Sequence, residues 1–492
     1  MAANKQQQLF EQAVSFARNG QFTRAINLYR SLLSKLPNHP EISLHCAHAL
    51  GLSGQRIEAG SIHEKLLISN KKAPELHVRM ARDREEWQDF EGALAHWNAL
   101  VAFPNQWYDQ AAYHRVRLLE RCNRVEEARA AWDDVVSKRE RVWGWYWLEG
   151  RLEERCGNLL AAKVAFQDGF EVAQGNNRAS CASAMARIAD RLAEYDEALR
   201  WIRVLHDLRS TEASRYRKRF PFPKVQVEIP AQLDKMSETK HETRLVFLTG
   251  FPRAGTTLMA RQLRDRRDVA ISEEFPYLRH LVDRQANAAG KLPALTKLAN
   301  GTLAPRGVDQ YWEAQQQTVT GFVPGETTLI DKNPAQGELA PWVLAIFPNA
   351  RILWMERDAR DMWLSAVMLD APVNAITCWW TEPVDFGRWL SWQAQLRDQL
   401  AESLPSNQFQ RVCYEKLVEN PDLIVDRVAD HFELEQLKAN SAVKTAGSVV
   451  TSPSYAEAIL PLSTDRTFRW RNYSGLLEGS QREAFDRLAE RI

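Results

Sequence analysis

The sequence lacks several features that would assign it at once to a class of proteins. Its six cysteines are scattered and form no C-x-x-C pair, which argues against a zinc site or a disulfide framework and favours a reducing compartment. The N-terminal segment has no continuous apolar run of the kind found in signal peptides, and no stretch is long enough to cross a bilayer. We therefore expect a cytoplasmic protein without a membrane partner.

An excess of charge of one sign is also missing. With 64 basic and 63 acidic residues the net charge is +1, so no global field would draw the chain to nucleic acid. Any anion site must therefore be local. A length of 492 residues with 45% apolar content is typical of a folded protein with two or more domains.

Residues 1–210 contain a repeat with a period of about 34 residues. In each unit a small or polar residue is followed five positions later by alanine. The pairs are Gly20/Ala25, Gly54/Ala59, Gln88/Ala93, Asn123/Ala128, Gly157/Ala162 and Ala193/Ala198. A period of this length resembles the tetratricopeptide repeat, in which helix–turn–helix units stack on their neighbours. The resemblance predicts an all-α solenoid, with Cys122 and Cys156 as small buried packing residues at equivalent positions.

The repeat pattern stops after about residue 208, and we assign residues 211–242 to a linker because the run from Arg215 to Pro230 contains three prolines. Its basic cluster from Arg215 to Arg219 is either a solvated run of charge or a docking site for an acidic partner. Over residues 243–492, three apolar strand-like runs, LVFLTG, TTLI and RILWM, alternate with helical patterns. This alternation predicts an α/β domain with a parallel sheet, whose ligands bind at the carboxyl ends of the strands.

One loop of the α/β part lacks a lysine that such loops normally carry. GFPRAGTT, from Gly250 to Thr257, fits the pattern G-x-x-x-x-G-K-[ST] except that Thr256 replaces the lysine. The loop lies between an expected strand and an expected helix, so its N–H groups can face an anion. The missing lysine disfavours a phosphotransferase, in which that lysine reaches the terminal phosphates. Arg253 is the cation that remains within the loop.

A second anion motif lies in RDARDMWLS. Arg357 ends an expected strand and Ser365 follows about two helical turns later, so both can meet an anion at the mouth of the sheet. The alternative is that Arg357 pairs with a neighbouring carboxylate, Asp358 or Asp361.

The motifs PRAGTTLM and RDARDMWLS together resemble those of sulfotransferases that use 3'-phosphoadenosine 5'-phosphosulfate (PAPS). The resemblance is strongest to tyrosylprotein sulfotransferases and to tetratricopeptide-repeat sulfotransferases, and it covers the chain from about Arg244 to its C-terminus. It implies transfer of a sulfuryl group from PAPS to an acceptor hydroxyl, with adenosine 3',5'-bisphosphate as the product nucleotide and no metal. The loop without its lysine would then hold a phosphosulfate.

The resemblance also implies which residues bind the cofactor. The first motif would hold the 5'-phosphosulfate and the second the 3'-phosphate. The full set is Arg253, Ala254, Gly255, Thr256, Thr257, Arg357, Ser365, Tyr414 and Arg469. Tyr414 lies in a Y-E-x-L stretch, and packing in the core would explain it equally well.

The resemblance assigns the general base to the stretch ISEEFPYL. Glu274 falls where tyrosylprotein sulfotransferases carry a catalytic glutamate, and Glu273 is the fallback. A hydroxyl acceptor needs such a base within hydrogen-bond reach. Paired acids are otherwise usual in a solvated turn.

The resemblance also implies that Arg253, Lys332 and Ser454 would stabilise charge on the sulfuryl group. For the two cations, fixed positive charge is the usual largest contribution in such transfers. Lys332, in TTLIDKNP, would replace the missing lysine of the loop from another strand. Its alternative is a surface pair with Asp331. The sequence departs from the family before Pro461, where residues 459–460 are apolar instead of basic.

The acceptor is left open, with a polypeptide hydroxyl slightly favoured. A concave repeat surface is suited to proteins or peptides. The alternative function is a repeat-based interaction scaffold that carries a catalytically inactive nucleotide-binding domain.

Overall fold

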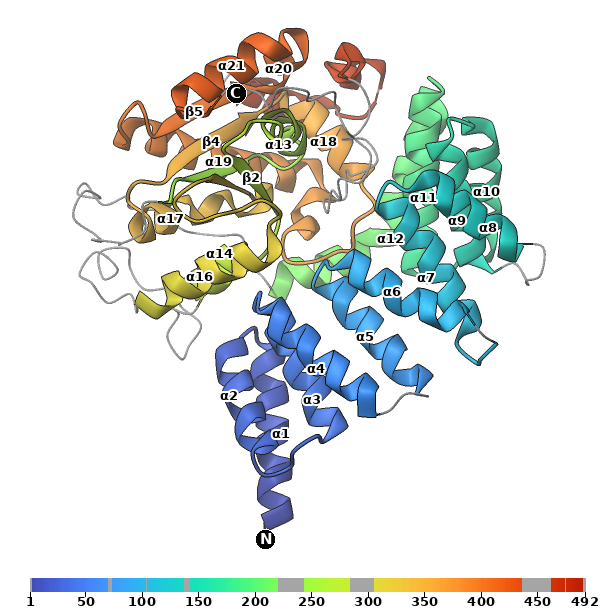
Figure 1. Ribbon diagram of the computed structural model, residues 1–492. Helices are drawn as coiled ribbons and strands as arrows, with labels where there is room; N and C mark the ends of the chain where they lie inside the picture. Colours follow the sequence, from blue (N-terminus) through green and yellow to red (C-terminus); the bar gives the residue numbers. More distant parts are fainter. Residues whose placement is uncertain are drawn as a thin grey trace.

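The computed structural model describes residues 2–69, 73–102, 104–136, 142–219, 243–283, 305–435, 462–473 and 475–489. They form a helical array followed by an α/β domain, as the sequence predicts (Figure 1). Within the described residues, no helix combines the length and the apolar character that crossing a bilayer requires.

The helical array consists of six antiparallel helix pairs. The helices are α1 (Ala2–Arg18), α2 (Phe22–Leu33), α3 (Pro40–Leu52), α4 (Arg56–Ser69), α5 (Pro74–Glu86), α6 (Phe90–Val101), α7 (Tyr108–Arg121), α8 (Val125–Val136), α9 (Trp143–Arg155), α10 (Leu159–Val172), α11 (Asn176–Arg191) and α12 (Tyr195–Arg219). The six recurring alanines are all fully buried, which lets the paired helices approach closely. The period in the sequence is therefore the period of helix packing.

A residue with left-handed backbone joins the two helices of every pair. The first members of the six sequence pairs have φ angles between 59° and 92°. One such residue ends a helix and turns the chain, which explains why small or polar residues recur there. The cysteine prediction is only half right, because Cys122 is buried but Cys156 is exposed.

Helix α12 continues beyond the last repeat, through residues 211–219, which the sequence analysis assigned to the linker. Its basic end is used within the chain. Arg217 donates hydrogen bonds to the carbonyl of Cys378 at 2.8 Å and to the hydroxyl of Thr381 at 2.7 Å. Residues 220–242 lie outside the described residues, and the domain boundaries stay a prediction.

The α/β domain is built on a parallel five-stranded sheet with the order β2-β3-β1-β4-β5. The strands are β1 (Leu245–Gly250), β2 (Val269–Glu273), β3 (Thr328–Lys332), β4 (Arg351–Glu356) and β5 (Phe409–Cys413). All six residues of β1 are buried, as expected for a central parallel strand covered on both faces. The sequence analysis placed β1, β3 and β4 correctly and missed β2 and β5, the two edges.

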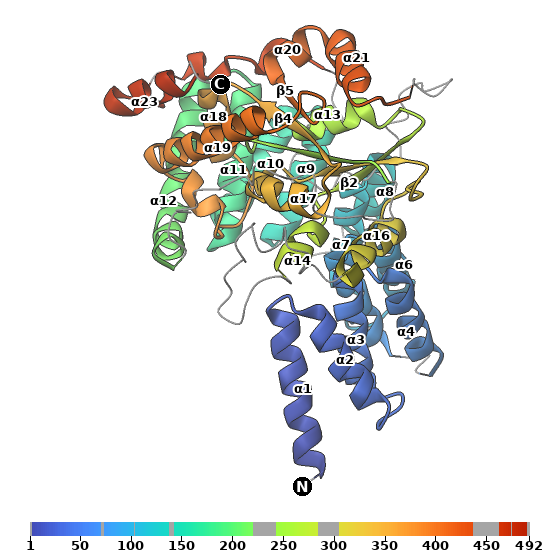
Figure 2. The same ribbon diagram turned by 90° about the vertical axis from the view of Figure 1, so that its left-hand side faces the viewer.

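Helices cover both faces of the sheet (Figures 1 and 2). They are α13 (Thr256–Leu263), α14 (Tyr277–Asp283), α16 (Pro305–Thr318), α17 (Ala340–Ile346), α18 (Ala359–Val367), α19 (Pro383–Ser403), α20 (Tyr414–Glu419), α21 (Pro421–His431) and α23 (Gly479–Ala489). Short 3-10 helices add η2 (Pro334–Leu339), η3 (Thr377–Trp380), η4 (Thr464–Arg466) and η5 (Arg469–Asn472). Because β1 pairs in parallel with both β3 and β4, the carboxyl ends of these three strands lie side by side.

The repeats curve around the α/β domain, and described residues near both ends of the array contact it (Figure 1). Near the N-terminus, the Arg56 guanidinium lies 4.9 Å from the ring centre of Phe275, directly after β2. At the other end, the Ser183 hydroxyl of α11 donates to the carbonyl of Met368 at 2.7 Å. Buried residues of α11 and α12 belong to the same apolar core as the sheet, so the two parts pack as one body.

Candidate active site

The loop after β1 is shaped by two glycines. A Cβ on Gly250, whose φ is +136°, would lie 2.3 Å from the carbonyl oxygen of Met355. A Cβ on Gly255, at φ +93°, would lie 2.5 Å from the ring of Tyr414. Between them Arg253 adopts a φ of +72°, which a residue with a side chain rarely does. The loop is thus held tightly against β4 and α20 and presents the N-terminus of α13.

This loop opens onto a cavity of about 720 Å³. One wall holds most of the residues that the sequence analysis proposed, among them Arg253, Glu274, Arg357, Ser365, Tyr414 and Arg469. The opposite wall comes from the repeats, with residues of α8, α9 and α11. The cavity is therefore formed jointly by loops of the α/β domain and by the helical array.

Lys332 supplies at the loop the cation that Thr256 does not. Parallel pairing places Lys332 of β3 beside Leu248 of β1, and its side chain is fully buried. Its Nζ lies 3.3 Å from Oγ1 of Thr257 and 2.7 Å from Oε1 of Glu274. Burial lowers the pKa of Lys332, but the two neighbouring glutamates outweigh it and raise the pKa above its ordinary value. The ammonium group therefore stays charged.

The two adjacent glutamates occupy different environments. Glu273 ends β2, is buried, and binds both Arg264 and Lys332, so it does not lie in a solvated turn. Glu274 turns out of the strand with a φ of +56°, and its side chain lines the cavity. Of the two candidate bases, Glu274 is the one that can reach a ligand there.

Lys332 forms no surface pair with Asp331. Asp331 is fully buried and accepts a hydrogen bond from the Tyr311 hydroxyl at 2.8 Å. Burial raises the pKa of Asp331 to about 7. The alternating direction of side chains along β3 thus sends these neighbours to opposite faces.

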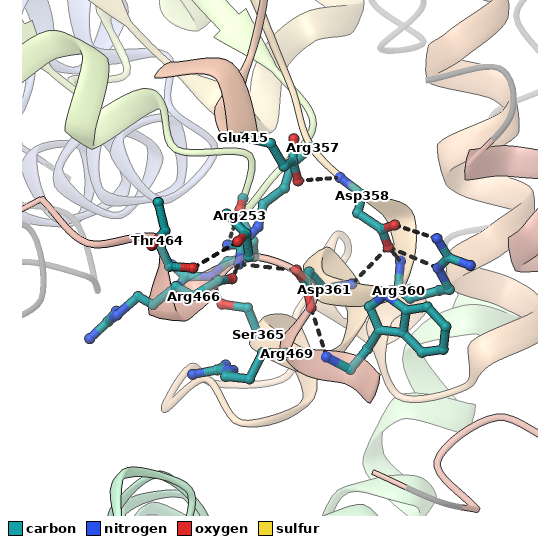
Figure 3. Close-up of polar contacts among 12 residues, drawn as sticks. Arg253, Arg357, Asp358, Arg360, Asp361, Ser365, Glu415, Thr464, Arg466 and Arg469 are labelled. Atoms are coloured by element: carbon teal, nitrogen blue, oxygen red, sulfur yellow. Dashed lines mark hydrogen bonds and ion pairs between the residues drawn. The ribbon is translucent and has the colours of Figure 1, made fainter. Parts of the chain in front are cut away.

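The second motif meets the first at the cavity (Figure 3). Nε of Arg253 donates to Oγ of Ser365 at 2.9 Å, and Nη1 of Arg357 donates to the carbonyl of Arg253 at 3.3 Å. The Arg357 guanidinium also lies 4.3 Å from the ring centre of Tyr414. The structure therefore brings together residues that the sequence analysis divided between two ends of the cofactor.

The alternative expected for Arg357, an ion pair with a neighbouring carboxylate, is present in part. Its Nη2 lies 3.8 Å from Oδ2 of Asp361, whereas Asp358 pairs with Arg360. Nη2 also donates to the carbonyl of Arg466, a cavity residue that the sequence analysis missed. A carbonyl acceptor leaves no side-chain motif, so no sequence signal marks this contact.

Arg469 reaches the cavity from η5, and its Nη1 donates to Oδ2 of Asp190 on α11 at 2.7 Å. Asp190 was also missed, because the two residues are 279 positions apart in the chain. Ser454 and the departure at residues 459–461 lie outside the described residues.

The site fits an anionic group. Nε of Arg357 and Nε of Arg469 are buried and have no hydrogen-bond partner among the described residues. A buried donor without a partner costs about 1–3 kcal/mol, which a bound anion would recover. Both arginines line the cavity beside the glycine-shaped loop. These unused donors and the tight loop are the features that a phosphate-bearing cofactor requires.

Comparison with known proteins assigns this domain. Residues 246–438 match the family model described as "Sulfotransferase family", so the α/β part of the chain is a sulfotransferase-family domain. The chain joins this domain to helical repeats of the tetratricopeptide kind.

Two curated relatives match different shares of the chain. A putative protein-tyrosine sulfotransferase of Caenorhabditis briggsae is 25% identical over 201 residues, which cover 39% of this chain and 66% of the relative. An uncharacterized protein of Aquifex aeolicus is 22% identical over 286 residues, which cover 55% of this chain and 37% of that protein. The chain thus matches less than two thirds of the length of each relative.

Solved structures show only distant likeness. The sulfotransferase domain of the Synechococcus PCC 7002 olefin synthase is 17% identical, with a TM-score of 0.38, and the match covers 54% of this chain and 98% of that domain. A tetratricopeptide repeat protein from Parabacteroides merdae is 16% identical, with a TM-score of 0.34. That match covers 45% of this chain and 95% of the repeat protein. Scores of this size support no argument about function.

Proposed function

We propose that this chain is a sulfotransferase that moves a sulfuryl group from PAPS to an acceptor hydroxyl. The observation that carries the proposal is the contact of Lys332 with both Thr257 and Glu274, at the mouth of a loop that lacks its own lysine. A buried cation thus lies directly behind a candidate base and an anion loop that both line the cavity. The matched sulfotransferase family model supports the same reaction class.

The residues of the two motifs would hold the cofactor. Arg253 and the N-terminus of α13, from Thr256 onward, would face the 5'-phosphosulfate, and Arg357 with Ser365 would face the 3'-phosphate. When bound, PAPS supplies the sulfuryl group, and adenosine 3',5'-bisphosphate is the nucleotide left after transfer. The chain would hold this nucleotide with backbone N–H groups and guanidinium groups, and the proposal includes no metal.

Glu274 would act as the general base. Lys332 holds its Oε1 at 2.7 Å, which orients the carboxylate and leaves Oε2 to take the proton of the acceptor hydroxyl. The acceptor oxygen then forms its bond to sulfur as the bond from sulfur to the phosphate oxygen breaks. Lys332 and Arg253 would stabilise the negative charge that develops during this exchange, and Ser454 retains this role as a prediction.

The acceptor would enter between the loop and the repeats. Arg187 and Arg191 lie one helical turn apart on α11, line the cavity, and share the carboxylate of Glu154 on α9. Such a polar wall on a concave repeat surface supports a protein or peptide acceptor. A cytoplasmic location stays part of this proposal.

The scaffold alternative is not favoured, because the contact between Glu274 and Lys332 has the geometry of a working site. Calorimetric titration with adenosine 3',5'-bisphosphate tests the proposal, with magnesium–ATP as the comparison. We expect tight binding that needs no magnesium and that Arg357→Ala abolishes. Arg411→Ala is the matched control, since Arg411 is an exposed arginine on β5. Binding of ATP alone, or of neither nucleotide, would contradict the proposal.

A further inference from the structure

The repeat helix α11 reaches into the group of residues proposed to bind the cofactor. Asp190, one residue before its end, has a side chain that is only 5% exposed. Oδ2 accepts from Nη1 of Arg469 at 2.7 Å, and Oδ1 accepts from the hydroxyl of Tyr473. Burial and the Asp190 carboxylate raise the pKa of Tyr473, so the hydroxyl keeps its proton and remains a donor. Both oxygens of one buried carboxylate are therefore used to hold the segment that carries Arg469.

This segment, residues 462–473, lies between α11 and the second anion motif. On the motif side, the backbone N–H of Trp470 donates to Oδ1 of Asp361 at 2.9 Å, and the Arg360 guanidinium lies 4.0 Å from the Trp470 ring centre. On the repeat side, Asp190 provides the charged contact, and the ring of Tyr195 lies 5.5 Å from that of Tyr473. Asp190 therefore decides where the segment sits relative to the repeats.

The orientation of the Arg469 guanidinium gives this clamp a functional meaning. Asp190 binds Nη1, whereas Nε is buried and has no partner among the described residues. Arg469 also lines the cavity, and the preceding residue, Phe468, has a strained φ of +53°. One edge of the guanidinium is thus held in place, and another is left for an anion.

The other charged groups near this end of α11 are already engaged. Arg187 and Arg191 contact Glu154, while Glu194 binds Lys163 at 2.5 Å. Asp190 instead serves the α/β domain, through Arg469 and Tyr473.

We propose that Asp190 is a positioning residue for the nucleotide, acting through Arg469, so that the sixth repeat is part of the cofactor site. This inference rests on the proposed function, because it takes the anion at Arg469 to be the nucleotide. It goes further by giving the repeats a role in cofactor binding in addition to acceptor capture.

The direction in which Asp190→Asn changes nucleotide affinity separates a positioning role from simple electrostatics. Removing a negative charge near an anion site would by itself tighten anion binding. A positioning role predicts weaker binding. In Asp190→Asn the amide oxygen can accept from only one of the two donors, Arg469 and Tyr473, and the NH₂ group is turned toward the other. We expect the dissociation constant of adenosine 3',5'-bisphosphate to rise about tenfold, the effect of losing one charge-assisted hydrogen bond.

The experiment is calorimetric titration of the full chain with adenosine 3',5'-bisphosphate, with thermal melting of each variant. Glu194→Gln is the matched control, since it removes a carboxylate of the same repeat that faces Lys163, and we expect a change below twofold. In a double-mutant cycle, Asp190→Asn should have little further effect once Arg469 is replaced by alanine. Tyr473→Phe combined with Asp190→Asn should recover part of the affinity, because the amide oxygen is then free to accept from Arg469.

Each outcome bears on the proposal. Weakened binding of Asp190→Asn that vanishes in the Arg469→Ala background supports it. Unchanged or tighter binding, or an equal loss in the presence and absence of Arg469, overturns it and leaves the proposed function standing. A wild-type chain that does not bind the nucleotide overturns the proposed function and this inference together.

Discussion

Left-handed backbone conformations occur at residues other than glycine in both parts of the molecule, but they do different things there. In the repeats, Gln88, Asn123 and Ala193 adopt them two residues after a helix ends and turn the chain toward the next helix. In the α/β domain, Arg253 and Glu274 adopt them at the cavity. At Ala193 glycine can replace the residue because only the turn matters, whereas the Asn123 side chain also accepts a hydrogen bond from Arg155. The second group uses the turn to aim a side chain, so glycine would keep the turn and lose the function.

The largest expected effect is at Glu274. Glu274→Gln keeps the size of the side chain and removes the base, so turnover should fall by about 10²- to 10⁴-fold. Binding of adenosine 3',5'-bisphosphate should change little, which separates catalysis from folding. The measurement is the rate of PAPS-dependent sulfation of an accepted acceptor, with calorimetry of the product nucleotide beside it. A fully active variant would remove Glu274 from the mechanism.

Two glycines with positive φ sharpen the comparison between the parts. A Cβ on Gly250 would meet the backbone of Met355, whereas Gly157 in the repeats has no atom within 4 Å of that position. Gly157→Ala should therefore cost about 1–3 kcal/mol of unfolding free energy from backbone strain alone. Gly250→Ala should cost more and should also weaken nucleotide binding, since the loop must shift. Denaturant unfolding and calorimetry of both variants test this prediction. Equal losses of unfolding free energy and of nucleotide affinity in the two variants would contradict it.

The buried Asp331 predicts a pH dependence of stability. Its pKa is about 7 in the folded chain and near 3.8 when exposed, so between these values the folded protein holds a proton that the unfolded chain has lost. The free energy of unfolding should therefore fall as pH rises from about 4 to 7, by at most about 1.4 kcal/mol per unit for this proton. Asp331→Asn should flatten this slope, whereas replacing the exposed Asp309 of α16 by asparagine should not. Urea unfolding across that pH range gives both slopes.

The smallest expected effect is in the repeats. Ala193 is exposed and has a φ of +59°, so Ala193→Gly relieves strain and should raise unfolding free energy by up to about 1 kcal/mol. The buried Ala198, inside α12, is the opposite case, and glycine there should destabilise the chain by about 1 kcal/mol. Thermal melting distinguishes the two. Equal shifts would show that the turn conformation carries no strain.

Sequence patterns predicted the central parts of the fold and missed its edges. The strands β1, β3 and β4 are apolar runs because they lie inside the sheet. The edge strands β2 and β5 have less regular patterns, and β5 is half-exposed over most of its length. An edge strand has one neighbour, so its side chains need not be apolar, and the hydrophobic signal weakens.

The residues of the candidate site could likewise be predicted from the sequence only in part. Gly250, Arg253 and Gly255 lie within one short loop, and a fixed spacing in the sequence suffices to predict their shared role. Exposed Cys156 shows the limit of that reasoning, because an equivalent repeat position does not ensure equivalent burial.

The sequence by itself determined the helical period, the central strands and the anion loop, because each depends on residues a few positions apart. Only the tertiary structure decided that Lys332 meets Glu274, and that Asp190 of the repeats holds Arg469. These contacts join distant segments, and their partners are set by how strands pair and how the solenoid curves. Local spacing carries no information about either, since a side chain's partner is chosen by packing and not by its neighbours in the chain.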